Sequence, residues 1–148
     1  ITFGFQIAGL PGRWFTAPAP AIRRSREEAH LDKSALGAIG DSAVVDLFGL
    51  GGQVLDLAAA SREALQAHLP ADALERPEKA LNARLDGLGG RRAVTDVRRV
   101  AASGAGPLVL LGMIEAGGQA GRIGGGVVDL PAAVLAQALA PLDAAIEA

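Results

Sequence analysis

The chain has 148 residues, half of them hydrophobic, which is enough for one domain with a hydrophobic core. Its 16 acidic and 14 basic residues leave a formal net charge of −2, so the composition argues against a nucleic-acid or anionic-membrane binder. Cysteine is absent, which excludes disulfides, thiolate metal sites and a cysteine nucleophile and fits a cytoplasmic location. The longest apolar run, residues 107–114, is far shorter than the ~20 residues that cross a bilayer.

The first twenty residues predict a β-hairpin. Apolar and polar residues alternate over residues 1–7, the pattern of a strand with one buried face. Glycine and proline at residues 9–12 predict a turn, and residues 13–17 can return as the second strand. Pro18 and Pro20 fix φ and lack amide donors, so the second strand must end there or lie at a sheet edge.

Aromatic residues are concentrated in this hairpin, because four of the five in the chain are Phe3, Phe5, Trp14 and Phe15. We interpret Trp14 and Phe15 as core or interface anchors, with stacking on a ligand as the alternative. The sequence starts in mid-strand and without methionine, so we expect it to be the C-terminal part of a longer protein or a chain whose start was trimmed. The aromatic residues then favour a role for the hairpin at a junction with the rest of that protein, ahead of a role beside a cleft.

The middle of the chain predicts helices separated by turns. Residues 22–38 are polar and predict a solvated helix or loop. Side-chain oxygens of Asp41 and Ser42 can cap a helix that carries the apolar residues 44–48, before a GLGG stretch at residues 49–52. Proline and glycine positions delimit further helices, which we expect over residues 54–69, over residues 77–87, and from a cap at Thr95 to Gly104.

The last third predicts a buried strand and a final helix. Residues 107–114 form a continuous apolar run, residues 117–126 a glycine-rich loop, and Val127 and Val128 a short strand. A helix begins at Pro131, with a kink expected at Pro141. Strands and helices are mixed without a steady βαβ alternation. We therefore predict an α+β fold, with a mixed sheet, an N-terminal hairpin and packed helices.

Three runs of sequence resemble one known family in their order along the chain. They are FGFQIAGLPGRWFTAPAP, IGDSAVVDLFGLGG and DVRRVAASGAGPLVLLGMIEAGGQAGRIGGGVVDLP. They are similar to the C-terminal half of the YlbE/YahG-like bacterial proteins, a domain of unknown function. The resemblance implies a single domain over residues 1–148, made of a strand pair with a proline-rich exit (1–20), a variable charged segment (21–40) and an α/β body (41–148).

Members of that family resemble one subunit of a heteromeric oxamate carbamoyltransferase, whose partner subunit is similar to acyl-CoA synthetases. The resemblance implies transfer of a carbamoyl group between oxamate and phosphate. Two features of the family are replaced in this sequence. The charged run RRSREEAHLDKSALGA replaces a glycine- and tyrosine-rich loop, and Leu110-Leu111-Gly112 replaces an Asn-Thr-Gly turn that precedes a histidine. A non-catalytic relative is therefore the alternative.

A carbamoyl or phosphate ligand needs donors, such as arginine, hydroxyls and the backbone amides of glycine-rich turns. Arg122 is the best single candidate, because a cation among amides attracts an anion; a solvated arginine is the alternative. We expect its GRIGGG stretch to lie near the GLGG turn and to form one anion site with it, although glycines also serve tight turns. Asp41 and Ser42 are candidates for binding the substrate, and the alternative role of their side chains is to cap a helix. The candidate substrate-binding residues are Arg13, Thr16, Asp41, Ser42, Gly51, Gly52, Gly121, Arg122 and Gly124.

The sequence predicts no cofactor and no metal site, and it identifies no catalytic residue. Its glycines match neither dinucleotide-binding nor phosphate-loop spacing, and its two histidines, His30 and His68, are far apart. Two hypotheses stay open: a subunit of a carbamoyltransferase-like complex with a cleft shared with a partner chain, or a non-catalytic assembly domain. Both predict an oligomer with a partner protein, and the first adds a small carbamoyl or phosphate ligand.

Overall fold

The computed structural model describes residues 2–26, 30–37 and 43–147. Short helices surround three antiparallel sheets in this part of the chain, β1–β2, β3–β7–β6 and β4–β5. The α+β class is confirmed, and the strands form separate antiparallel sheets instead of one mixed sheet. The strands are β1 Thr2–Phe5, β2 Phe15–Pro18, β3 Arg23–Arg26, β4 Leu81–Leu85, β5 Arg91–Thr95, β6 Leu108–Ile114 and β7 Arg122–Asp129. The α-helices are α1 Ala43–Phe48, α2 Ala59–Leu65, α3 Arg76–Ala80, α4 Val97–Ser103, α5 Ala132–Ala136 and α6 Leu139–Ile146.

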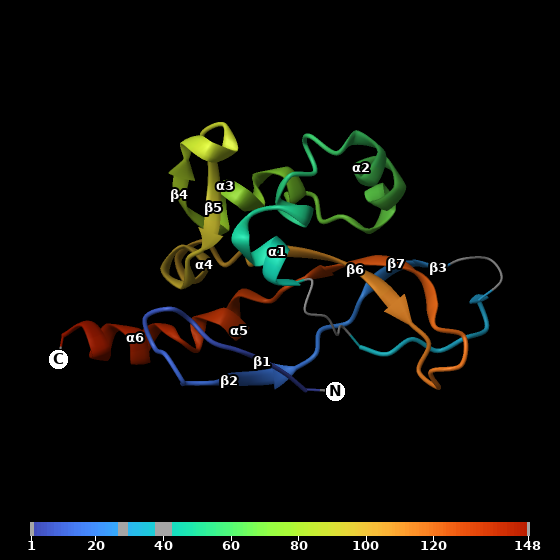
Figure 1. Cartoon of the computed structure of the whole chain (residues 1–148), viewed down its shortest axis with the longest axis horizontal. Coiled ribbons are helices and arrows are strands. Elements are labelled where there is room, and N and C mark those ends of the chain that lie inside the picture. Colours follow the sequence, from blue (N-terminus) through green and yellow to red (C-terminus); the bar gives the residue numbers. More distant parts are fainter. Residues whose placement is uncertain (1, 27–29, 38–42, 148) are drawn as a thin grey trace.

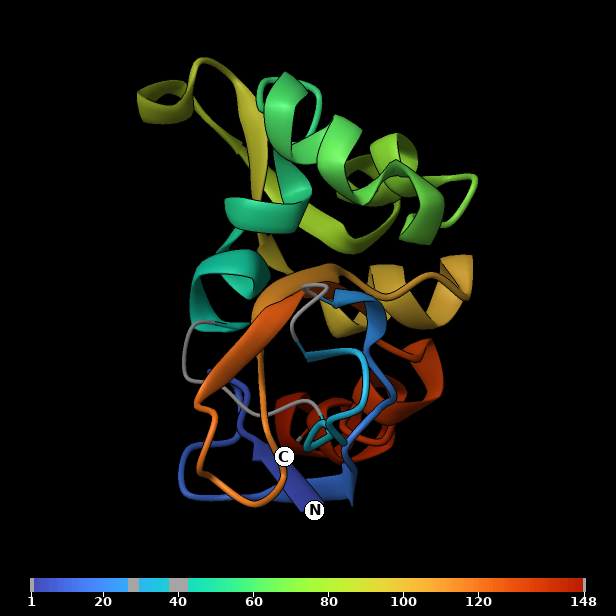
Figure 2. The same cartoon turned by 90° about the vertical axis from the view of Figure 1, so that its right-hand side faces the viewer.

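The long β6–β7 pair runs between two groups of elements. Figure 1 shows α2, α3 and the β4–β5 hairpin on one side of this pair and the β1–β2 hairpin with α6 on the other. The view turned by 90° keeps the same order (Figure 2). One apolar cluster, which includes Phe15, Val100 and Leu135, joins the N-terminal hairpin to α4 and α5. A second cluster, which includes Leu55, Leu108 and Val127, lies between the β6–β7 pair and the segment around α2.

The predicted N-terminal hairpin is confirmed. Strands β1 and β2 pair from Thr2 with Pro18 to Phe5 with Phe15, and the ring centroids of Phe5 and Phe15 are 5.3 Å apart. Because successive side chains of a strand point to opposite faces, Phe15 is buried while Trp14 is exposed. Trp14 is therefore not a core anchor in this chain, where its ring lies over the backbone of Gly4, and its role as an interface anchor stays a prediction.

The predicted helix over residues 77–87 is wrong beyond Ala80. Helix α3 ends there, and Leu81–Leu85 is a strand that pairs with β5. The turn between the two strands contains Gly89 and Gly90 at φ 63° and 75°, a conformation that glycine adopts without steric cost. The long-range pairing with β5 outweighs the helical spacing of Leu81 and Leu85.

Two further strands replace predicted loops. Residues 23–26 form β3, which pairs with β7, although residues 22–38 predict a helix or loop. The glycine-rich loop predicted over residues 117–126 is wrong from Arg122 onward, because β7 begins at that residue. The strand is central in its sheet, so β3 and β6 satisfy its backbone groups on both sides.

Helix ends differ from the prediction in two places. Asp96, not Thr95, caps α4 by accepting hydrogen bonds from the N–H groups of Arg98 and Arg99, while the hydroxyl of Thr95 donates to the carbonyl of Leu47. The predicted C-terminal helix is divided into α5 and α6, with the break just before Leu139. Pro141 then stands in the first turn of α6, where a helix does not need its missing N–H.

Candidate functional site

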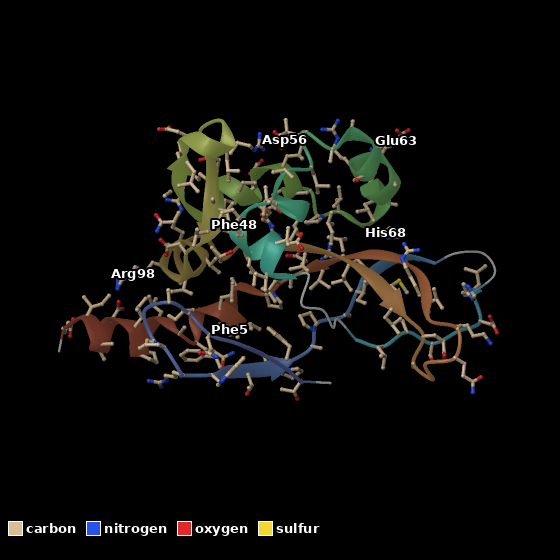
Figure 3. All side chains as sticks on the ribbon, in the orientation of Figure 1. Phe5, Phe48, Asp56, Glu63, His68 and Arg98 are labelled. Atoms are coloured by element: carbon tan, nitrogen blue, oxygen red, sulfur yellow. The ribbon has the colours of Figure 1, made fainter. Side chains whose placement is uncertain are left out.

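The candidate residues of the N-terminal hairpin lie on its exposed surface. The guanidinium of Arg13 is 5.4 Å from the centroid of the Phe15 ring, an arrangement typical of a cation–π contact. Thr16 is exposed on β2. Asp41 and Ser42 are outside the described residues, so their predicted roles are not tested. Figure 3 shows Phe5 on the hairpin, near α5.

The GLGG turn at residues 49–52 encloses a carboxylate of the chain itself. Asp46 is buried on the inner side of α1, and its Oδ1 accepts hydrogen bonds from the N–H of Gly52 at 2.6 Å and of Leu110 at 3.1 Å. A Cβ atom at Gly51 would lie 2.4 Å from this oxygen. The turn therefore does bind an anion, but that anion is Asp46, a residue that the sequence analysis did not single out.

The second glycine-rich turn is arranged in the same way. The carboxylate of Glu115 accepts hydrogen bonds from the N–H of Gly117 at 2.7 Å and of Gln119 at 2.9 Å. These donors hold the pKa of Glu115 below its usual value. Gly121 closes this turn, since its carbonyl accepts a hydrogen bond from the N–H of Glu115.

The two turns do not meet in one anion site. Gly52 lies against Leu108 at the start of β6, whereas Gly124 pairs with Met113 near the other end of that strand. At ~3.3 Å per residue, the two places are on the order of 16 Å apart. Arg122 belongs to β7, and its side chain lies over the backbone of Gly112. The expected joint site is therefore wrong, and a separate binding role for each candidate stays a prediction.

A different place in the described residues forms a pocket. Its volume is about 650 Å³, and it opens where the exit of the N-terminal hairpin meets the segment after α4 and the end of β7. SGAGP, VVDLP and the end of TAPAP, which belong to the runs that carry the family resemblance, meet there. Arg23 comes from the charged run that replaces a loop of the family. The lining residues are Pro20, Ala21, Arg23, Arg76, Gly104, Gly106 and residues 129–133.

Arg76 lines this pocket and is itself buried. Its guanidinium donates to both carboxylate oxygens of Asp129, at 2.8 and 3.3 Å, and to the carbonyl of Gly106 at 2.6 Å. Its Nε donates to Asp72 at 2.9 Å. Two carboxylates compensate this buried cation, so Arg76 connects α3 to β7 and has few donors left for a ligand.

Arg23 is the more accessible cation of the pocket. Its side chain is 51% exposed, and its guanidinium lies 3.5 Å from Oδ2 of Asp129. A planar amide or carbamoyl group needs one donor for its oxygen and one acceptor for its N–H. Arg23 and Asp129 present both within one opening, which is suitable for such a group.

The candidate substrate-binding residues from the sequence include none of the three polar residues of the pocket. Arg23 belongs to a charged run that predicts a solvated segment, and Arg76 precedes a proline in an amphipathic stretch. Only Asp129 has a sequence position that indicates a functional residue. It follows the β-branched pair Val127-Val128 and precedes Leu130-Pro131, where a strand is expected to end. Long-range contacts bring the three together, and no local pattern records such contacts.

The described ranges contain no group of three or more histidines, cysteines or carboxylates that could hold a metal ion. No helix in them is long and apolar enough to span a bilayer.

Known proteins resemble this chain over nearly all of its length. The crystal structure of a conserved protein of unknown function from Enterococcus faecalis V583 matches with a TM-score of 0.82 and 26% identity, over 99% of this chain and 37% of that one. The oxamate carbamoyltransferase subunit AllG of Escherichia coli K12 is 32% identical over 95% of this chain and 36% of its own length. The uncharacterised protein YahG of the same organism is 28% identical over 94% of this chain and 31% of its own length.

No family model matches the sequence. The resemblance predicted from the motifs is confirmed as far as YahG and AllG are concerned. The chain is thus similar, over nearly its whole length, to YahG and to the carbamoyltransferase subunit AllG, and it spans about a third of the length of each.

Proposed function

We propose that this chain is part of a subunit of a carbamoyltransferase-type complex, and that the pocket beside Arg23 and Asp129 holds a small carbamoyl or amide substrate. The observation that carries the proposal is the 32% identity to AllG over 95% of the chain. The relatives are about three times as long. The chain then corresponds to one domain of such a subunit, acting with a partner protein in a cytoplasmic complex.

The pocket supports this proposal through its chemistry. The guanidinium of Arg23 can donate to a carbamoyl oxygen or to the carboxylate of a substrate such as oxamate. The carboxylate of Asp129 can accept an amide N–H while its two hydrogen bonds from Arg76 hold it in position. The group transferred would therefore be fixed in orientation, while the remaining chemistry is supplied elsewhere in the complex.

The test uses the full-length protein isolated from its native source together with whatever co-purifies. Carbamoyl phosphate and oxamate are supplied, and the release of phosphate is followed. We expect Arg23→Ala to lower kcat/KM by on the order of 10- to 100-fold, the effect of losing one charge-assisted hydrogen bond. The matched control is Arg98→Ala, since Arg98 is similarly exposed and paired with a single carboxylate, Asp143. Equal activity of the two variants would remove the pocket from the proposal.

A second function is supported by a specific observation. Both glycine-rich turns direct their amides to carboxylates of the chain itself, Asp46 and Glu115, and the other described candidates do not converge with them. This arrangement favours a non-catalytic assembly domain of the same kind of complex. A purified complex that retains its partner but transfers no carbamoyl group would support this alternative and contradict the first.

A further inference from the structure

Helix α1 exposes apolar side chains and buries its charged one, which is the reverse of an ordinary surface helix. Its one charged residue, Asp46, is 3% exposed, whereas Val44, Val45 and Phe48 are 68%, 49% and 42% exposed. At 100° per residue these three side chains share one outward stripe. An apolar stripe in water and a carboxylate in the core are the opposite of what a solvent-facing helix requires. Figure 3 marks Phe48 on this helix.

The buried carboxylate keeps the helix in this orientation. Oδ1 of Asp46 accepts hydrogen bonds from the amides of Gly52 and Leu110, which belong to two different elements. Rotation of α1 that buried Val44 and Phe48 would withdraw the carboxylate and leave both amides without a partner. The apolar stripe is thus held rigidly outward, as a preformed binding surface requires.

The lengths of the relatives indicate what covers the stripe. The E. faecalis protein has the same fold over 99% of this chain, yet the matched part is 37% of that polypeptide. In AllG and YahG the matched parts are 36% and 31%. In each case one polypeptide joins the matched part to a remainder about twice its size, which can lie against it without a separate binding event.

We propose that the outward stripe of α1, formed by Val44, Val45 and Phe48, is a docking surface for polypeptide that corresponds to the unmatched remainder of these relatives. The contact is apolar at its centre, with Phe48 as the aromatic anchor. None of these three residues lines the substrate pocket, which opens at the end of β7, next to α5.

In the first test, this chain is superposed on the E. faecalis crystal structure. The solvent exposure of the side chains at the positions equivalent to Val44, Val45 and Phe48 is then measured in that structure. We expect these positions to be covered by the part of that chain outside the match. Positions that face solvent, or that contact a second copy only, would overturn the proposal.

The second test is made in solution with the 148-residue chain, using 1-anilinonaphthalene-8-sulfonate as a probe of exposed apolar surface. The double variant Val44→Lys, Phe48→Lys should reduce dye fluorescence by at least about half. The control Ile146→Lys changes an equally exposed apolar residue on α6 and should leave the signal unchanged. Circular dichroism checks that both variants are folded, and Val45→Lys replaces the double variant if that one unfolds. Equal signals from all folded variants, or a stable dimer that only the α1 substitutions dissociate, would contradict the proposal.

Discussion

The backbone N–H of Gly52 donates a 2.6 Å hydrogen bond to the carboxylate of Asp46, and both groups are buried. The same oxygen accepts from Leu110, so one side chain connects α1, the GLGG turn and β6. This contact explains two features at once: why the turn is rich in glycine, and why an apolar helix carries a carboxylate on its inner side.

Asp46→Ala should lower the free energy of unfolding by about 2–4 kcal/mol, because the buried N–H of Gly52 and the partly buried N–H of Leu110 lose their acceptor. Asp46→Asn should cost less, about 1 kcal/mol, since an amide oxygen can accept both hydrogen bonds. Chemical denaturation measures both values. Equal losses for the two variants would show that acceptance of these bonds is not what stabilises the turn.

Burial raises the pKa of Asp46, against the opposing effect of the amides of Gly52 and Leu110. The folded state therefore binds this proton more tightly than the unfolded chain. The stability that this proton contributes is complete below the pKa of Asp46 in the unfolded chain, and it is lost as the pH rises through the pKa of Asp46 in the folded chain. The unfolding free energy of the wild type minus that of Asp46→Asn should fall as the pH is raised from about 3 to about 8. A difference that increases with pH would contradict the assignment.

Gly52→Ala should be strongly destabilising, by about 3 kcal/mol, because the new Cβ would lie 2.6 Å from the carbonyl oxygen of Leu108. The clash is with backbone atoms of Leu108, which cannot move away without displacing β6. The matched control is Gly87→Ala, where no atom lies within 4 Å and φ is not positive. There we expect a gain of about 0.5 kcal/mol through the unfolded state. Thermal denaturation of the two variants separates the predictions.

Arg76→Ala should lower the free energy of unfolding by about 3 kcal/mol, since it leaves the buried carbonyl of Gly106 without its donor and leaves Asp129 with only the exposed Arg23 as a cationic partner. Arg98→Ala removes an exposed ion pair with Asp143 and should cost about 0–1 kcal/mol. Urea denaturation compares the two. A loss for Arg76 as small as that for Arg98 would mean that this cluster is solvated.

Glu115→Gln should accelerate hydrogen exchange at the amides of Gly117 and Gln119, because these amides donate hydrogen bonds to the Glu115 carboxylate. These amides lower the pKa of Glu115, so its ionised form contributes stability above the unfolded pKa, and this contribution is lost as the pH falls through the folded pKa. Nuclear magnetic resonance titration measures this pKa directly. A pKa at or above the usual value would contradict the observed turn.

Local patterns account for part of this structure. The alternation in residues 1–7, the apolar run of residues 107–114 and the glycine after α4 depend on neighbours in the chain, and those predictions are confirmed. The same holds for the α+β class, which follows from the mixture of such elements.

Tertiary contacts decided the rest. Residues 23–26 and 81–85 became strands because β7 and β5 offered pairing partners, and pairing energy exceeds the small differences in local propensity. The glycine-rich turns predicted an anionic ligand, whereas in the folded chain their amides donate to Asp46 and Glu115. The pocket combines Arg23, Arg76 and Asp129 from three distant segments. A sequence determines which chemical groups are available and how they repeat locally, whereas long-range packing determines which of them meet.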